Sequence, residues 1–263
     1  MTCPLCGNMK GYTLNALGAH CEGMPCGQCG CNIRNRFFYH VWNDKAAELA
    51  ARKRVRALEV AGYGYAKLGA KHVETANKRG IDLLCGDFYE RDFRAERYVD
   101  LCDLQFGDNE LDLIGHSHVQ EHIEQDTLAM RECYRCLSPG GSLVFSLPVQ
   151  TDFTFPVSGE FHGDNAPVFR RNGWDIVDKL LAVGFRVSVL VPCVHFAICP
   201  TQPHLDDQYV LDDIRLGAKF GRQFEKRQAL FHPASLARTS EEQGFDKVWG
   251  QLEVFCATKP LVT

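Results

Sequence analysis

The chain lacks any long hydrophobic run. None of its 263 residues lies in a window that approaches the ~20 apolar residues of a membrane-spanning helix. The most apolar stretch, residues 187–199, is short and is interrupted by Pro192 and His195. We therefore expect no membrane partner. The first residues also lack a basic region followed by an apolar one, so we expect no secretory signal and predict a reducing, cytoplasmic location.

An excess of charge of one sign is missing as well. The 29 basic and 33 acidic residues give a net charge of −4, with a pI near 6.2. This balance argues against a protein that binds nucleic acid through bulk electrostatics. Low-complexity tracts are absent, and a hydrophobic content of 45% is enough for a sizeable core. These values exclude a disordered or fibrous chain.

Cysteine, by contrast, is abundant. Six of the 13 cysteines fall within the first 31 residues: Cys3, Cys6, Cys21, Cys26, Cys29 and Cys31. Four of them form two matched Cys-x-x-Cys-Gly units, Cys3 with Cys6 and Cys26 with Cys29. Two such turns offer four thiolates, which is the ligand set of a structural zinc ion. The segment is short and polar, so metal binding would supply much of its folding free energy.

The sequence therefore predicts a zinc-ribbon-like module over residues 1–35. Cys21 or Cys31 could replace one of the four ligands. The alternative is that all six are free thiols in a flexible leader, which does not explain the matched units. A third Cys-x-x-Cys, Cys133 to Cys136, lies in a helical segment without further ligands nearby, and we interpret these two cysteines as core or half-buried residues.

A basic and aromatic stretch follows the cysteines. We predict a linker helix within residues 36–55, with its regular part at 46–54 and Asn43 as a possible cap. Its basic residues could contact a polyanion such as RNA, although a solvated linker helix is the interpretation we favour. They are Arg34, Arg36, Lys45, Arg52, Lys53, Arg54 and Arg56.

From residue 56 onward, short apolar runs alternate with helical patterns. The expected strands cover 57–60, 81–85, 98–102, 111–115, 142–147, 185–191 and 252–257, and the expected helices 65–77, 125–136 and 173–183. This order predicts an α/β fold: a Rossmann-like, doubly wound, mostly parallel seven-stranded sheet with helices on both faces. We expect one domain over 56–263, with a long insertion at about 192–250 that carries an amphipathic run at 220–231.

Four motifs in this region occur in a recognisable order. They are Leu-Glu-Val-Ala-Gly-Tyr-Gly at 58–64, Asp-Leu-Gln-Phe-x-Asp-Asn-Glu-Leu-Asp-Leu-Ile at 103–114, His-Val-Gln-Glu-His-Ile at 118–123 and Leu-Ser-Pro-Gly-Gly at 137–141. Together they resemble the class I S-adenosylmethionine-dependent methyltransferases, and in particular a branch with an HVxEHI segment after the fourth strand. The resemblance runs from about residue 56 to 191 and returns at 252–260.

The resemblance implies that S-adenosylmethionine binds at the turn after the first strand. Glu59 could attract the cationic cofactor, and Ala61, Gly62 and Gly64 would let the backbone approach it. A fuller glycine run is usual in the family, so this turn departs from the pattern. A simple tight turn is the structural alternative.

Two further acids are implied at the cofactor. Asp87, at the carboxyl end of the second strand, is the expected ribose ligand, and Asp82 is the alternative earlier in that strand. Asp103 and Leu104 resemble the loop around the adenine, where a turn aspartate exposed to solvent is the competing interpretation.

The loop after the fourth strand is the expected place of the chemistry. Methyl transfer is an in-line displacement that requires an aligned nucleophile and, where that nucleophile is protonated, a base. His116 and His118 are our candidates, and His116 would also contact the cofactor; a purely structural role is the alternative for both. His162, Asn165 and Arg170 are candidate substrate contacts in the segment that should cover the pocket.

The sequence thus predicts a methyltransferase that uses S-adenosylmethionine on a small-molecule acceptor and carries one zinc ion. Two alternatives remain: an RNA methyltransferase that binds RNA through the cysteine module and the basic stretch, and an inactive zinc-bearing adaptor with this fold. The acceptor atom and the oligomeric state do not follow from the sequence.

Overall fold

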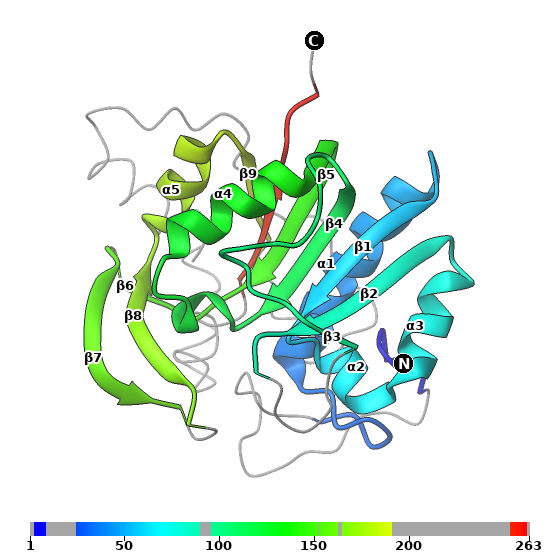
Figure 1. The fold of residues 1–263 in the computed structure, drawn as a ribbon. Coiled ribbons are helices and arrows are strands. Elements are labelled where there is room, and N and C mark those ends of the chain that lie inside the picture. The colour runs from blue at the N-terminus through cyan, green and yellow to red at the C-terminus, as the bar shows by residue number, and fades with distance from the viewer. Residues whose placement is uncertain are drawn as a thin grey trace, which may run out of the picture.

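The computed structural model describes residues 3–8, 25–89, 96–151, 153–162, 165–190 and 253–261. Cys21, the 192–250 insertion and its run at 220–231 lie outside these ranges. Within them, a central sheet is covered by helices on both faces (Figure 1). No helix in these ranges is long and apolar enough to cross a membrane.

The central sheet has seven strands, as predicted, in the order β3-β2-β1-β4-β5-β10-β9. Their bounds are Val55–Val60 (β1), Ile81–Asp87 (β2), Arg97–Tyr98 (β3), Leu111–Ser117 (β4), Leu137–Ser146 (β5), Arg186–Leu190 (β9) and Val254–Thr258 (β10). β1 to β5 pair in parallel, and β10 is antiparallel to both β5 and β9. The strand order reverses between β1 and β4, which is where the crevice of such a sheet opens.

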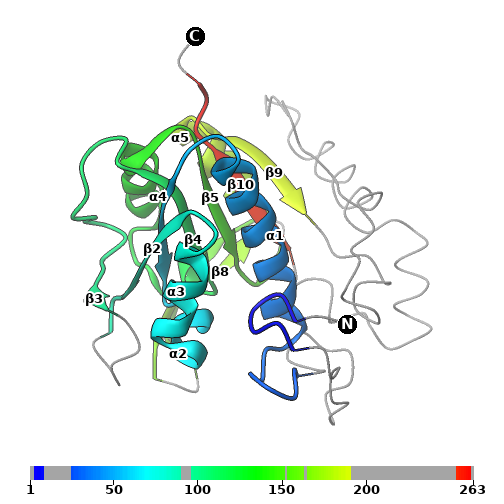
Figure 2. The ribbon, with the colours of Figure 1, turned by 90° about the vertical axis from the view of Figure 1, so that its right-hand side faces the viewer.

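Helix α1 (Ile33–Ala50) differs most from its predicted form. It begins 13 residues before position 46, because Asn32, and not Asn43, caps it by accepting a hydrogen bond from the Asn35 N–H at 2.9 Å. The helix is also not a solvated linker, since Phe38, Tyr39 and Trp42 are buried. It covers the face of the sheet opposite α4 (Asp126–Cys136) and α5 (Ile176–Val183) (Figure 2).

Two other elements depart from the predicted pattern at glycines. The expected helix over 65–77 is broken into α2 (Tyr63–Leu68) and α3 (Ala70–Asn77) by Gly69, whose φ is +54°. The Ser-Pro-Gly-Gly segment, which precedes the strand expected over 142–147, lies inside β5, where the register with β4 shifts between Leu111 and Leu113. Gly140 there has a φ of +82°, so the four residues form a bulge and not a strand end.

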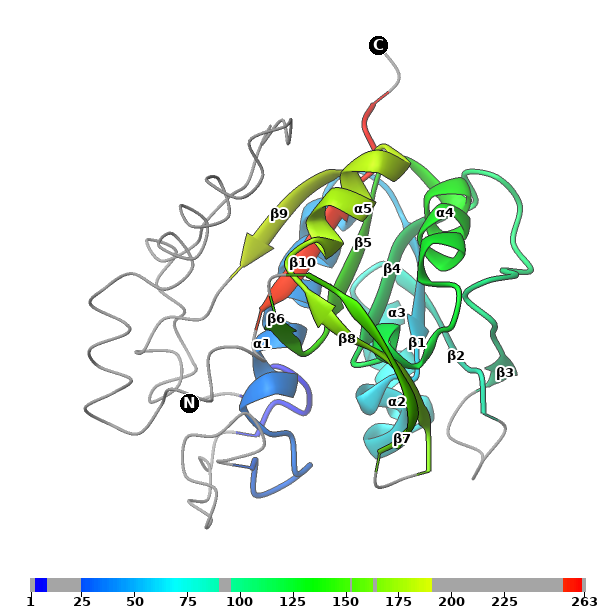
Figure 3. The same ribbon diagram turned by 90° about the vertical axis from the view of Figure 1, so that its left-hand side faces the viewer.

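A second, three-stranded sheet was not predicted. It consists of β6 (Val149–Thr151), β7 (Phe155–Phe161) and β8 (Pro167–Gly173), in the order β6-β8-β7. This sheet lies beside the carboxyl ends of the parallel strands (Figure 3). The short 3-10 helix η2 (Gln120–His122) packs against β8.

Buried cysteines are part of the core of the main sheet and its helices. Cys85, Cys133, Cys136 and Cys256 are at most 6% exposed. The interpretation of Cys133 and Cys136 as core residues is confirmed.

Candidate functional site

A cavity of about 810 Å³ opens where the carboxyl ends of β1, β2 and β4 meet. Its volume is in the range of about 300–1,000 Å³ that small-molecule and cofactor sites occupy. Most of the residues singled out from the sequence line it. These are Glu59, Ala61, Gly62, Asp87, His116, His118 and His162.

Glu59 anchors the wall at the end of β1. Its side chain is 1% exposed, and each carboxylate oxygen has a protein partner. The Tyr39 hydroxyl donates to Oε1, and His72 Nε2 donates to Oε2 at 2.6 Å. A carboxylate offers about four lone-pair sites, so Glu59 retains capacity for a cationic ligand. Burial, followed by the charge of Glu59, raises the pKa of Tyr39, which therefore stays protonated as the donor.

The turn after β1 needs its glycines for steric reasons. A Cβ on Gly62 would overlap the Glu59 carboxyl group, and one on Gly64 would come within 2.6 Å of the His72 ring. Gly64 does not line the cavity; its N–H donates to the Tyr39 hydroxyl at 2.5 Å. Ala61 has a φ of +50°, a conformation usually left to glycine. Ala61 thus adopts a backbone conformation that glycine favours, and Gly62 keeps the close approach to Glu59.

The register of the strands separates Asp87 from Asp82. Asp82 pairs with Arg56 near the amino end of β1. Asp87 comes directly after Gly86, which pairs with Val60 at the carboxyl end of β1. Only Asp87 reaches the cavity, and its Oδ1 accepts the Tyr89 N–H at 3.1 Å. Of the two predicted positions, Asp87 is the one that shares an edge with Glu59.

The structure does not bring Asp103 and Leu104 to the cavity. Asp103 is exposed, and the Leu104 N–H donates to Oε2 of Glu132 in α4 at 3.2 Å. The residues just after β3, Asp100 and Leu101, line the cavity in their place. Sequence reasoning missed them because it extended β3 to residue 102, although an acid at the end of that strand follows the same rule that identified Asp87.

His116, near the end of β4, and His118, just after it, both line the cavity, but their environments differ. His116 is 1% exposed, and its Nδ1 has no hydrogen-bond partner in the described ranges. Burial lowers the pKa of His116 to about 3, below the useful range expected from the sequence, so the ring is neutral. His118 Nδ1 lies 3.2 Å from Arg34 Nη1 and 3.4 Å from Glu121 Oε1.

The three candidate substrate residues separate in the structure. His162 lines the cavity, whereas Asn165 and Arg170 do not. Asn165 has a φ of +61° in the turn between β7 and β8, where its N–H donates to the His162 carbonyl at 2.9 Å. Arg170 donates to the carbonyls of Gln120, Ile123 and Glu124. Its guanidinium therefore holds the loop after β4 in place.

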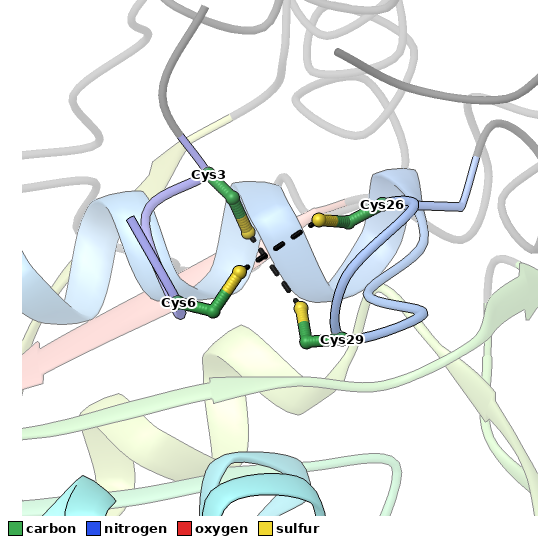
Figure 4. Close-up of side chains that lie close together, drawn as sticks. All are labelled: Cys3, Cys6, Cys26 and Cys29. Carbon is green, nitrogen blue, oxygen red and sulfur yellow. Dashed lines mark hydrogen bonds between the residues drawn. The ribbon is translucent and has the colours of Figure 1, made fainter. Parts of the chain in front are cut away.

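The predicted cysteines come together. The Sγ atoms of Cys3, Cys6, Cys26 and Cys29 all lie within 4.8 Å of one another and point to a common centre (Figure 4). The Cys3–Cys29 and Cys6–Cys26 sulfur pairs are 3.8 and 3.7 Å apart. A tetrahedron with Zn–S bonds of about 2.3 Å has edges of about 3.8 Å. The four sulfurs therefore fit a zinc ion.

The two cysteine turns share one backbone geometry. Gly7 and Gly30 each have a φ of +71°, and each donates its N–H to the carbonyl of the first cysteine of its unit, at 2.9 and 2.8 Å. The Asn8 side chain also donates to Cys26 Sγ at 3.4 Å. Cys31 is buried beside Cys3 and Cys29 but is not one of the four mutually close ligands.

The basic stretch is largely engaged within the protein. Arg36 is fully buried and donates to the Cys31 carbonyl at 2.8 Å. Lys45 pairs with Glu48 at 2.7 Å, Lys53 with Asp112 at 2.5 Å, and Arg56 with Glu110. Several of the basic residues that had suggested a polyanionic partner therefore have partners within the protein.

Comparisons with known proteins agree with the fold. Residues 43–145 match a sequence family described as a methyltransferase domain. A proposed sarcosine dimethylglycine methyltransferase from Galdieria sulphuraria has a similar structure, with a TM-score of 0.51 and 13% identity over 87% of this chain and 86% of that one. The protein therefore has the Rossmann-like fold of S-adenosylmethionine-dependent methyltransferases.

Two more distant structures are also similar. An S-adenosylmethionine-dependent methyltransferase from Mesorhizobium loti gives a TM-score of 0.45 and 16% identity, covering 83% of this chain and 96% of that one. The cyclase SpnF gives 0.46 and 18%, covering 85% and 82%. Comparison with curated protein sequences gives no match.

Proposed function

We propose that the protein transfers a methyl group from S-adenosylmethionine to a small-molecule acceptor in the cavity at the ends of β1, β2 and β4. The observation that carries the proposal is the convergence of Glu59, the Ala61–Gly62 turn, Asp87 and His116 on one cavity. These groups come from three strands, and they match in kind what a cationic, ribose-bearing cofactor requires.

Each residue has a defined part in this proposal. Glu59 accepts from the ammonium group, and Asp87 accepts from the ribose hydroxyls. The cofactor supplies an electrophilic methyl group on a positively charged sulfur. The protein aligns an acceptor lone pair with that carbon, and the bond to sulfur breaks as the new bond forms. His116 and His118 line this part of the cavity, where they would contact the acceptor.

The size of the cavity and the paired charges favour a small acceptor. About 810 Å³ must hold both the cofactor and the acceptor. Because Lys45, Lys53 and Arg56 pair with acids, they do not form a free basic surface of the kind that RNA binding requires.

Calorimetric titration with S-adenosylmethionine and with its demethylated product tests the cofactor assignment. Asp87→Ala should weaken binding about 10- to 100-fold, because a charge-assisted hydrogen bond contributes about 1.5–3 kcal/mol. Asp82→Ala removes an acid from the other end of the same strand and is the matched control, with unchanged affinity. Absence of binding to either ligand by the wild type would refute the proposal.

We further propose that Cys3, Cys6, Cys26 and Cys29 hold one structural zinc ion. Protein prepared without chelators should retain about one zinc per chain after dialysis, and Cys3→Ser should lose it. Cys102→Ser, a half-buried cysteine outside the cluster, is the control and should keep the metal. A zinc-free wild type, or a Cys3→Ser variant that retains the full amount, would contradict the assignment.

A further inference from the structure

A second group of metal-ligating side chains lies at the rim of the cavity, apart from the four cysteines. Glu121 and His122 belong to η2, and His162 follows β7 at the start of the turn to β8. One ligand atom from each residue lies within 4.8 Å of the other two. The three residues thus come from two elements 40 positions apart in the sequence, which the packing of η2 against β8 brings together.

Glu121 is the member of this group whose buried position most needs an explanation. It is 1% exposed, and neither carboxylate oxygen makes a hydrogen bond within the described ranges. His118 Nδ1 lies 3.4 Å from Oε1, but the two atoms do not have hydrogen-bond geometry. A buried carboxylate without hydrogen bonds is costly, so its retention calls for a partner that the described residues do not supply.

His122 is oriented as a metal ligand. Its Nδ1 lies 2.6 Å from the Pro167 carbonyl, which can only accept, so Nδ1 carries the proton. In the neutral ring, Nε2 is then left with a lone pair. A hydrogen bond from one ring nitrogen to a backbone carbonyl is the outer-sphere contact that commonly fixes a ligating imidazole. The ring also packs edge-to-face on His162, with centroids 4.6 Å apart.

We propose that Glu121, His122 and His162 bind a first-row divalent transition-metal cation such as zinc. Two imidazole nitrogens and one carboxylate oxygen suit such a cation, whereas magnesium and calcium prefer oxygen ligands throughout. Three protein ligands leave a coordination position open, as in catalytic and not structural sites.

The ligands need a small closure to bind the cation. Metal–ligand bonds of about 2.1 Å place tetrahedral ligand atoms about 3.4 Å apart, so separations of up to 4.8 Å must shorten by up to about 1.4 Å. His162 is exposed at the end of a hairpin strand and can make this movement. η2 is fixed, because Arg170 donates to the carbonyls of Gln120, Ile123 and Glu124.

The position of the site also defines the acceptor, a step that rests on the proposed function. His122 and His162 line the cavity together with His118. An acceptor with a hydroxyl or carboxylate oxygen could occupy the open coordination position, which would fix its orientation toward the methyl donor. We therefore infer an oxygen-bearing acceptor that binds the metal directly.

Cobalt(II) titration tests the metal site without any turnover. The cysteine cluster is first filled with zinc, and cobalt is then added to the full chain. We expect one further equivalent to give ligand-field absorption without thiolate-to-cobalt charge transfer. Glu121→Gln and His162→Ala should each weaken this binding by more than about tenfold, since even outer-sphere changes cost that much.

His40→Ala is the matched control. Its imidazole lines the hollow beside the cysteine cluster, so this variant should bind cobalt as the wild type does. His162 is exposed, and its variant should keep the wild-type circular dichroism spectrum even if Glu121→Gln does not fold. The proposal is overturned if no second equivalent binds, if that equivalent shows thiolate bands, or if His162→Ala binds it with unchanged affinity. Calorimetry with the demethylated cofactor on the same samples reports the cofactor site separately.

Discussion

Tyr39→Phe probes the hydrogen-bond network behind the proposed cofactor site. The hydroxyl of Tyr39 donates to the Glu59 carboxylate and accepts the Gly64 N–H at 2.5 Å, and the side chain is 1% exposed. Removing this oxygen takes a donor from a buried charge and leaves a buried N–H without its acceptor. The hydrophobic ring remains, so packing changes little.

The magnitude follows from the two lost bonds. A hydrogen bond to a charged group contributes about 1.5–3 kcal/mol, and an unsatisfied buried N–H costs about 1–3 kcal/mol. Because the cavity lets water approach, we use the lower end of each range and expect a loss of about 2–3 kcal/mol in the free energy of unfolding. For a chain of this size that corresponds to a fall in Tm of about 5–10 °C.

Thermal melts followed by circular dichroism, without ligand, provide the assay. Tyr63→Phe is the graded control, since it removes one neutral hydrogen bond, from the Tyr63 hydroxyl to the Cys29 carbonyl at 3.2 Å. That variant should lose only about 0.5–1.5 kcal/mol. A Tyr39→Phe protein that melts within about 2 °C of the wild type, or no lower than Tyr63→Phe, would refute the reasoning.

Two further substitutions test the interior of the sheet. The native state keeps His116 neutral with a pKa of about 3, whereas the unfolded chain protonates it below about pH 6.5. Stability should therefore fall as the pH is lowered between these values, with a slope that approaches about 1.4 kcal/mol per pH unit. Urea melts at about pH 6.5 and pH 5 should show this slope in the wild type but not in His116→Gln, and equal slopes would contradict the burial. Gly115→Ala places a methyl group against the buried Trp42 ring and should cost about 1–3 kcal/mol by the same measurement; an unchanged midpoint would show that Trp42 moves aside freely.

Features whose geometry is local could be predicted from the sequence. Each cysteine turn closes on itself through a hydrogen bond from the N–H of Gly7 or Gly30 to a cysteine carbonyl, so spacing alone predicted which four sulfurs come together. The position of Asp87 at the cavity could be predicted because the end of a parallel strand has a fixed place in this kind of sheet. The seven strands followed from the alternation of short apolar runs and helical patterns.

Features decided by tertiary packing could not be predicted. Asn32 and Asn43 are equally good caps by type, and the helix begins at the earlier one, where Phe38 and Trp42 can pack on the sheet. β7 carries exposed aromatic side chains and little alternation, so no strand pattern was visible. Arg170 was a candidate substrate contact, but carbonyl groups 46 and 50 residues away in sequence bind its guanidinium.

The cysteine cluster and the cavity share a wall, and this bears on what the cluster does. The Tyr63 side chain lines the cavity and donates to the Cys29 carbonyl. On the other side, α1 contributes Tyr39 to the cavity, and its Asn43 donates to the Pro4 carbonyl in the first cysteine turn at 3.1 Å. An RNA-binding appendage would need a free face and few such contacts. Because both cysteine turns are tied to cavity-lining elements, the arrangement favours a metal that stabilises the cofactor wall over one that recruits a polyanion.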